Sequence, residues 1–429
     1  MLKRTLTAWL VCTLSLGATT ATAQQPNVLL VIADDMGLDA SACYTVGNQQ
    51  AAMPTLERLC SEGLVFENAY AYPTCSPTRA ALMTGRYAAH TGIGGVVVWN
   101  RASPGLSTDE VSLFDIVTNA GYAAALFGKW HIGTRVDGFD HPAALGVPEY
   151  FGPYTGALKD YGSWTAIENG EEVEVTDYAT SALTDRAIDW IGGQDNPWFL
   201  WLAYNAPHAP FHVPPAELLG SAAGVEMATN LSKYQAMLTA MDTEFGRLLD
   251  SLDAETRANT VVIFIGDNGS PNQVARDLYA PNGAKGSLYE GGIHVPMIVS
   301  GPGITPGRTD ALVQVNDIHA TIAAMAGGKS ITADAFDISS VLGGGEGPRD
   351  TIFVEHFSDA PPRGSNTYGW IIRSGNDKLV MIDGQDPQLF DLSSDPLELK
   401  DRLTDGTSQE EAARIAELTA KAEAARSGD

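Results

Sequence analysis

Short, nearly continuous apolar runs recur along the chain, and each ends abruptly in polar residues. They occupy residues 26–33, 122–127, 198–204 and 260–265. Apolar residues without alternation are typical of strands buried on both faces, as in a parallel sheet. Helical periodicity marks residues 109–119 and 233–252, which lie between these runs. The order predicts an α/β fold: a large mixed, mainly parallel sheet sandwiched by helices.

The pattern changes near the C-terminus. Three short strands are predicted at 351–355, 368–373 and 378–382, followed by a polar, alanine-rich helix from about 409. Strands this close together in sequence favour antiparallel pairing. We therefore predict a main α/β domain over 24–345 and a smaller subdomain over 346–429 with an antiparallel sheet.

The first 23 residues predict a secretory signal peptide. Lys3 and Arg4 precede an apolar stretch at 8–16, and Ala21-Thr22-Ala23 forms an A-x-A cleavage site. A membrane anchor is the alternative, but the apolar stretch is far shorter than the roughly 20 residues that a spanning helix needs. We expect cleavage after Ala23 and a periplasmic or secreted protein.

Charge argues against two classes of partner. The formal net charge is −26, and removal of Lys3 and Arg4 leaves 24 basic against 52 acidic residues, or −28. Such an acidic surface repels nucleic acid and anionic membranes, so neither is an expected partner.

Three cysteines remain after the predicted cleavage, because Cys12 lies in the signal peptide. In an oxidising compartment Cys43 and Cys60 could pair, which would leave Cys75 alone. Alternatively, Cys60 is a small buried hydrophobe on a helix over 55–62. Cys75 stands at the predicted start of another helix, where a thiol ionises easily. No Cys/His/Asn arrangement in the sequence supports it as an ordinary nucleophile.

Polar clusters follow all four apolar runs. They contain Asp34 and Asp35, Lys129 and His131, His208, and Asp267 and Asn268. Ligands of open parallel sheets bind beyond the carboxyl ends of the strands, so we expect these clusters to converge. Each aspartate could instead cap a nearby helix. The agreement of four strand ends favours a single site.

The residue types at this predicted site suit a hard cation and an anion. Three carboxylates and the Asn268 carbonyl, without zinc-like Cys or His spacing, favour Ca²⁺, with Mg²⁺ possible. With a divalent ion present, Arg79, Lys129 and Lys285 leave the pocket at about +2, which attracts an anion. His131 and His208 are candidates for proton transfer.

These residues carry a family resemblance. Cys75-Ser76-Pro77-Thr78-Arg79 with Thr84-Gly85-Arg86 resembles the signature of formylglycine-dependent sulfatases, in the alkaline-phosphatase-like superfamily. Gly121-Tyr122 and the run Gly128 to His131 are similar to the family's second signature. The likeness continues through His208, Lys285 to Gly292, and the tail Leu389 to Leu392 with Asp395-Pro396. Ala124, Phe127 and His294 depart from the family pattern at positions that carry no chemistry.

The resemblance implies a sulfatase that hydrolyses sulfate monoesters of carbohydrates or aryl alcohols. Cys75 would be oxidised to Cα-formylglycine by a formylglycine-generating enzyme, and its hydrate would act through a covalent sulfo-enzyme intermediate. The implied calcium ligands are Asp34, Asp35, modified Cys75, Asp267 and Asn268. The implied catalytic residues are Cys75, Arg79 beside the hydrate, Lys129 and Lys285 on the sulfate, His208 as general acid and His131 as general base.

Two other functions stay open on the sequence. One is a phosphonate or phosphate ester hydrolase of the same superfamily, although such relatives tend to carry histidine where this chain has Asn268. The other is a noncatalytic binder of sulfated glycans. Candidate substrate contacts in loops are Trp99, Arg101, Tyr154, His356 and Arg363.

Overall fold

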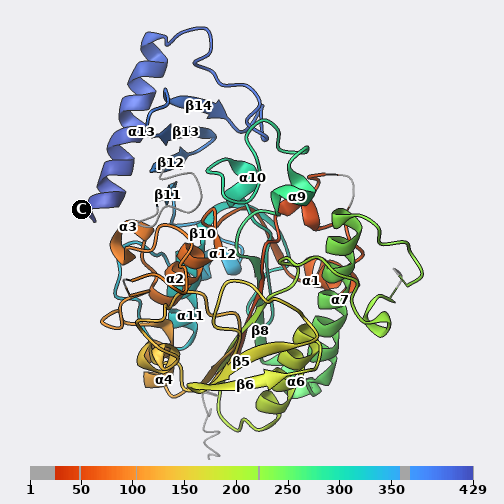
Figure 1. Ribbon diagram of the computed structural model, residues 1–429. Coiled ribbons are helices and arrows are strands. Elements are labelled where there is room, and N and C mark those ends of the chain that lie inside the picture. The colour runs from red at the N-terminus through yellow and green to blue at the C-terminus, as the bar shows by residue number, and fades with distance from the viewer. Residues whose placement is uncertain (1–24, 48–49, 103, 221–222, 358–367, 429) are drawn as a thin grey trace, which may run out of the picture.

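The computed structural model describes residues 25–47, 50–102, 104–220, 223–357 and 368–428 (Figure 1). The predicted signal peptide lies outside them. Within these residues ten strands form one sheet. In spatial order they are β10 (Gly307–Gln314), β2 (Leu64–Tyr70), β9 (Met297–Ser300), β8 (Thr260–Gly266), β1 (Asn27–Ala33), β7 (Trp198–Tyr204), β3 (Ala123–Gly128), β4 (Tyr150–Gly152), β5 (Trp164–Glu168) and β6 (Glu171–Val175).

The sheet is mixed but mostly parallel, as predicted. β9 and β5 are antiparallel to both of their neighbours, and the remaining pairs are parallel, so the other eight described strands run one way. The four strands predicted from apolar runs are β8, β1, β7 and β3, which are adjacent in this order. Their carboxyl ends therefore lie side by side.

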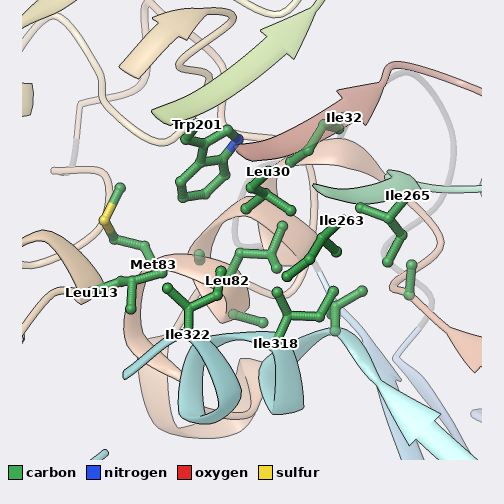
Figure 2. Close-up of a cluster of buried hydrophobic side chains, with 14 of the residues drawn as sticks. Leu30, Ile32, Leu82, Met83, Leu113, Trp201, Ile263, Ile265, Ile318 and Ile322 are labelled. Atoms are coloured by element: carbon green, nitrogen blue, oxygen red, sulfur yellow. The ribbon is translucent and has the colours of Figure 1, made fainter. Parts of the chain in front are cut away.

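Helices cover both faces of the sheet (Figure 1). One face packs against α2 (Cys75–Thr84), α4 (Leu113–Asn119) and α11 (Val315–Met325), and the other against α1 (Pro54–Glu62), α6 (Ala179–Gly192) and α7 (Asn230–Ser251). Alternate residues of β1 enter the two cores: Leu30 and Ile32 face the α2 side, and Leu29 and Val31 face the α7 side. Figure 2 shows Leu30 and Ile32 in the first core, with Leu82 of α2 close by. Burial of each such side chain contributes about 1.5–3 kcal/mol.

Shorter helices connect these elements. They are η1 (Leu38–Ala40), α3 (Ala88–Thr91), α5 (His141–Ala144), η2 (Ala216–Leu218), α8 (Ala254–Ala258), α9 (Asn272–Ala275), α10 (Glu290–Ile293) and α12 (Ser339–Leu342). The helix predicted from residue 109 begins later, because Ser112 and Asp115 form a capping box that starts α4 at Leu113. No helix in the described ranges is long and apolar enough to cross a membrane.

A second, antiparallel sheet follows, as predicted. Its strands are β11 (Thr351–His356), β12 (Gly369–Ser374), β13 (Asp377–Ile382) and β14 (Gln388–Asp391), in that order. Helix α13 (Gln409–Ser427) buries Leu418 against this sheet. Strand β14 was not predicted from the sequence. The division of the chain at 345/346 stays a prediction.

The structure decides between the two alternatives for Cys60, a disulfide or a small buried hydrophobe. Cys43 and Cys60 form a disulfide, and Cys75 is a free, buried thiol. The bond ties the loop after η1 to helix α1.

Candidate active site

Polar side chains from four neighbouring strand ends meet at one edge of the sheet. Asp34 and Asp35 follow β1, and Asp267 follows β8. The ligating atoms of these three carboxylates and of Cys75 all lie within 4.8 Å of one another, and all four residues are buried. Such a cluster suggests a metal site, because buried like charges need a compensating cation.

The backbone turns sharply to bring these side chains together. Asp35 has φ of 71° and His131 has φ of 59°, a left-handed conformation that residues other than glycine rarely adopt. The Asp35 N–H donates to Asp267 Oδ1 at 3.0 Å, which stabilises the turn after β1. Strain of this kind persists where the surrounding structure holds it, often at functional sites.

Asn268 completes the oxygen donors. Its Nδ2 donates to Asp35 Oδ1 at 2.8 Å, which orients the amide. Its Oδ1 is buried and has no hydrogen-bond partner among the described residues. A buried carbonyl oxygen without a donor beside three carboxylates is suited to ligating a cation.

Each carboxylate faces its own cationic side chain. Lys129 Nζ lies 2.6 Å from Asp34 Oδ2, Lys285 Nζ lies 2.5 Å from Asp35 Oδ1, and Arg79 Nη2 lies 2.8 Å from Asp267 Oδ2. The side chains of Arg79 and Lys129 are almost fully buried, whereas that of Lys285 is 21% exposed. Lys285 is therefore the cation of the three that solvent reaches most easily.

The pKa values follow from burial and these pairs. Burial alone would raise the pKa of Asp34, but Lys129, His208, Arg79 and Lys285 together hold it well below its usual value. Burial and then the charge of Asp34 raise the pKa of Asp267 to about 6. Burial lowers the pKa of Lys285, but the negative charges of Asp35 and Asp34 outweigh burial and leave that pKa above its usual value. Asp34 and Lys285 are therefore charged at neutral pH.

Cys75 is the first residue of the ten-residue helix α2. Its Sγ lies 3.4 Å from Asp34 Oδ1 and 3.7 Å from Lys285 Nζ. Burial raises the pKa of the thiol to about 12, because the nearby lysines compensate only in part. The unmodified thiol is neutral at physiological pH and so is a weak nucleophile.

The two histidines contact the site differently. His208 Nε2 lies 3.6 Å from Asp35 Oδ2, while its Nδ1 lies 2.7 Å from the Ala209 carbonyl oxygen and donates to it. His131 is buried, and its Nδ1 has no hydrogen-bond partner among the described residues. Burial lowers both pKa values, and for His131 the charges of Lys129 and Arg79 lower it further. His131 is therefore neutral.

Several supporting residues were not predicted from the sequence. Thr78 Oγ1 donates to the Asp267 carbonyl at 2.7 Å, and Ser76 Oγ donates to the His131 carbonyl at 2.7 Å. Asn205, directly after β7, is buried, and its side-chain nitrogen and oxygen have no partners among the described residues. Its place as the first polar residue after a buried strand was the signal that could have found it.

A pocket of about 300 Å³ has Trp99, Phe139 and Tyr154 among its lining residues. Trp99 stacks on Phe139 with ring centroids 5.3 Å apart, and Tyr154 meets both rings edge-on. The Tyr154 carbonyl accepts the His131 N–H at 3.1 Å. Gly156 lies against the imidazole, since a Cβ there would stand 2.4 Å from Nε2. The lining residue Tyr154 therefore contacts the backbone of His131, although His131 does not itself line the pocket.

The remaining predicted substrate contacts are not placed in this pocket. Arg101 lies in the loop two residues after Trp99, and His356 is half-buried at the end of β11. Arg363 lies outside the described residues.

A family model described as Sulfatase matches residues 26–328. The chain belongs to the sulfatase family. It is thus a hydrolase of sulfuric esters. The sulfatase is 29% identical to arylsulfatase A of Homo sapiens over 377 residues, which cover 79% of this chain and 72% of that protein. It is 33% identical to N-acetylgalactosamine-6-sulfatase of Sus scrofa over 343 residues, covering 72% and 63% of the two chains.

Solved structures resemble the sulfatase over nearly its whole length. The crystal structure of Ps i-CgsB in complex with k-i-k-neocarrahexaose has a TM-score of 0.81 at 26% identity, covering 94% of this chain and 93% of that chain. A structure in complex with its substrate D-glucosamine-2-N,6-O-disulfate has a TM-score of 0.73 at 20% identity, covering 94% and 98%. The latter likeness shows the shared fold.

Proposed function

We propose that this sulfatase is an exported, calcium-dependent enzyme that hydrolyses sulfate monoesters of carbohydrates once Cys75 has been oxidised to Cα-formylglycine. The observation that carries the proposal is the arrangement around Cys75. Its Sγ belongs to the carboxylate cluster, 3.4 Å from Asp34 Oδ1, and also lies 3.7 Å from the ammonium of Lys285. A cation and an anion can therefore be held at the same residue.

The donor set fits calcium. Asp34, Asp35 and Asp267 supply carboxylate oxygens, and Asn268 supplies the buried Oδ1 described above. Magnesium also takes oxygen ligands, but it usually keeps several waters, and this cluster is closed to solvent. With calcium bound, the hydrated aldehyde at position 75 would supply the nucleophile that attacks sulfur.

The cationic side chains bind and polarise the sulfate. Lys129 and Lys285 neutralise charge that grows on the sulfate oxygens during transfer, which is usually the largest electrostatic contribution to catalysis. Arg79 holds neighbouring groups of the site in place. Its Nη1 donates to the Lys129 carbonyl at 2.8 Å, and its Nη2 donates to Asp267 Oδ2. Arg79 thus fixes both a lysine and a carboxylate.

The histidines move protons at opposite sides of the reaction. The Nδ1–H of His208 is held by Ala209, so Nε2 is the nitrogen that faces the site and protonates the leaving alcohol oxygen. The anionic sulfate favours the charged form of His208. His131 is neutral because of burial, so it can accept a proton.

The aromatic pocket supports a sugar as the leaving alcohol. Trp99, Phe139 and Tyr154 provide flat apolar faces, while Glu172 and Glu174 at the same pocket can accept hydrogen bonds from hydroxyl groups. Trp99→Ala should raise KM for a sulfated sugar at least several-fold and leave KM for a small alkyl sulfate unchanged. Equal changes in KM for both substrates would contradict binding of the sugar in this pocket.

Export and maturation belong to the same proposal. The predicted signal peptide over 1–23 and the Cys75-Ser76-Pro77-Thr78-Arg79 motif indicate that a formylglycine-generating enzyme acts on the chain during export to the periplasm or medium. Mass spectrometry of the tryptic peptide containing position 75 tests this, with formylglycine as the expected residue. Fully active enzyme that contains only unmodified cysteine would overturn the mechanism.

The substrate class is tested separately by turnover. Sulfated monosaccharides, sulfated oligosaccharides, aryl sulfates, and phosphate and phosphonate esters are assayed with the same preparation. We expect the highest kcat/KM on sulfated sugars. Preference for a phosphorus ester, or binding of sulfated glycans without turnover, would contradict the proposal.

A further inference from the structure

The loop that carries Lys285 is held at both ends by one residue of the C-terminal tail. At its start, Asn282 Nδ2 donates to the main-chain carbonyl of Glu398 at 2.5 Å. At its end, the Glu290 N–H donates to Glu398 Oε2 at 2.5 Å. Glu398 therefore bonds to both ends of residues 282–290, which we call the lysine loop.

A buried ion cluster reinforces the second of these bonds. Lys378 of β13 is fully buried, and its Nζ lies 2.8 Å from Glu290 Oε1 and 2.8 Å from Glu398 Oε1. Tyr70 and His294 contact the other oxygen of Glu290, each at 2.9 Å. Desolvation makes such clusters poor sources of stability compared with apolar packing of the same volume. The ion cluster is better explained by a role in fixing the positions of Glu290 and Glu398.

The tail adopts an unfavourable conformation to make these contacts. Glu398 has φ of 56°, in the left-handed region. Asp395 holds the turn, since its carboxylate accepts the N–H groups of Leu399 at 3.0 Å and Lys400 at 2.8 Å. In this turn the carbonyl and the carboxylate of Glu398 both reach the lysine loop.

The middle of the lysine loop faces the site. The Lys285 N–H donates to the Ser270 carbonyl at 3.0 Å, and the Gly286 N–H donates to the Pro73 carbonyl at 2.8 Å. Pro73 lies two residues before Cys75. The position of the Lys285 ammonium depends on this backbone, because a lysine side chain by itself is flexible.

We propose that Glu398 is a positioning residue for Lys285, so that the C-terminal subdomain takes part in binding the sulfate. Glu398 fixes the two ends of the lysine loop, and the loop presents the ammonium to the substrate. The inference rests on the proposed function, in which Lys285 contacts the sulfate. It assigns a role to the Asp395-Pro396 tail motif.

A double-mutant cycle on kcat/KM tests the inference. Glu398→Ala, Lys285→Ala and the double variant are compared using a nitrophenyl sulfate. We expect Glu398→Ala to lower kcat/KM about tenfold or more in the wild type but less than about twofold in the Lys285→Ala background, because the two residues act as a unit. Glu398→Gln keeps an acceptor for the Glu290 N–H and should restore most of the activity.

Two further variants separate positioning from general stability. Asp391→Ala is the matched control, since this tail carboxylate makes its bonds to Ser393 and Ser394 within the tail itself. It should leave kcat/KM unchanged. Asn282→Ala removes one anchor and leaves the ion cluster intact, so it replaces Glu398→Ala in the cycle if that variant does not fold.

The possible failures are distinguishable. Equal losses from Glu398→Ala in both backgrounds, with thermal unfolding confirming folded protein, would overturn the positioning role. Full activity of Lys285→Ala alone would instead overturn the role of Lys285 in the proposed function.

Discussion

His208 and His131 both flank the site, but their ring nitrogens have different surroundings. His208 places Nε2 3.6 Å from Asp35 Oδ2 on a side chain that is 19% exposed, whereas His131 is buried with Gly156 against its ring. The same residue type is therefore suited to two roles. In the proposed function His208 protonates the leaving alcohol, while His131 is buried and uncharged.

This difference predicts a leaving-group effect. His208→Ala should slow a sugar sulfate by about 10² to 10⁴ and a nitrophenyl sulfate far less, because the nitrophenolate scarcely needs a proton. His131→Ala, which acts after the alcohol has left, should slow both substrates alike. Steady-state kcat on the two esters checks this. Equal losses in His208→Ala at normal metal content would make Lys285 the proton donor.

Helix α2 carries Cys75 and Arg79, and its other end packs against α11 through His319. The His319 side chain is fully buried, with Nδ1 3.3 Å from the Leu82 carbonyl of α2. Burial lowers its pKa to about 4, although the backbone contacts to Leu82 and Met83 oppose the shift. Protonation of His319 is therefore disfavoured in the folded protein at neutral pH.

The contact predicts a pH dependence of stability. The unfolded chain binds a proton at this histidine near pH 6.5, and the folded chain does so only near pH 4. The unfolding free energy is thus complete above pH 6.5 and is lost as the pH falls toward 4, by about 2 kcal/mol at about pH 5. Urea unfolding of wild type and His319→Gln should show a steeper decline for the wild type. Parallel profiles would contradict the prediction.

At the scale of the whole molecule, the site joins segments from most of the chain. Strand ends of the large sheet supply the carboxylates, α2 supplies Cys75, and the lysine loop connects the site to the small sheet. Three carboxylates, each paired with one basic side chain, come together at this site only when the chain is folded. A ligand that binds only the folded state stabilises it. A bound divalent ion should therefore stabilise the entire fold.

Metal removal tests this expectation. A calcium chelator should lower both activity and the unfolding temperature, and calcium should restore them more fully than magnesium. At a hundredfold excess over Kd, bound calcium adds about 2.7 kcal/mol to the unfolding free energy. Asn268→Ala removes one oxygen ligand and should need more calcium for the same shift. An unfolding temperature that changes with neither chelator nor calcium would contradict a calcium site.

The sequence by itself was sufficient to predict the central strands and the residues at their ends. Strands buried on both faces are apolar without interruption, so β1, β3, β7 and β8 were visible locally, and the polar residues that follow them are Asp34, Lys129, His208 and Asp267. The Cys75 to Arg79 motif is also contiguous. Their roles in catalysis remain predictions that the variants above test.

Only the tertiary structure decided which distant residues support the site. Edge strand β6, with its mostly exposed glutamates, has no apolar signature, because its hydrogen-bonding partner β5 determines its conformation. The aromatic pocket combines loops near Trp99, Phe139 and Tyr154. Glu398 and Lys378 bond to Glu290 across 108 and 88 residues of sequence. Such contacts depend on how the two sheets pack against each other. A local pattern of hydrophobic and polar residues therefore cannot predict them.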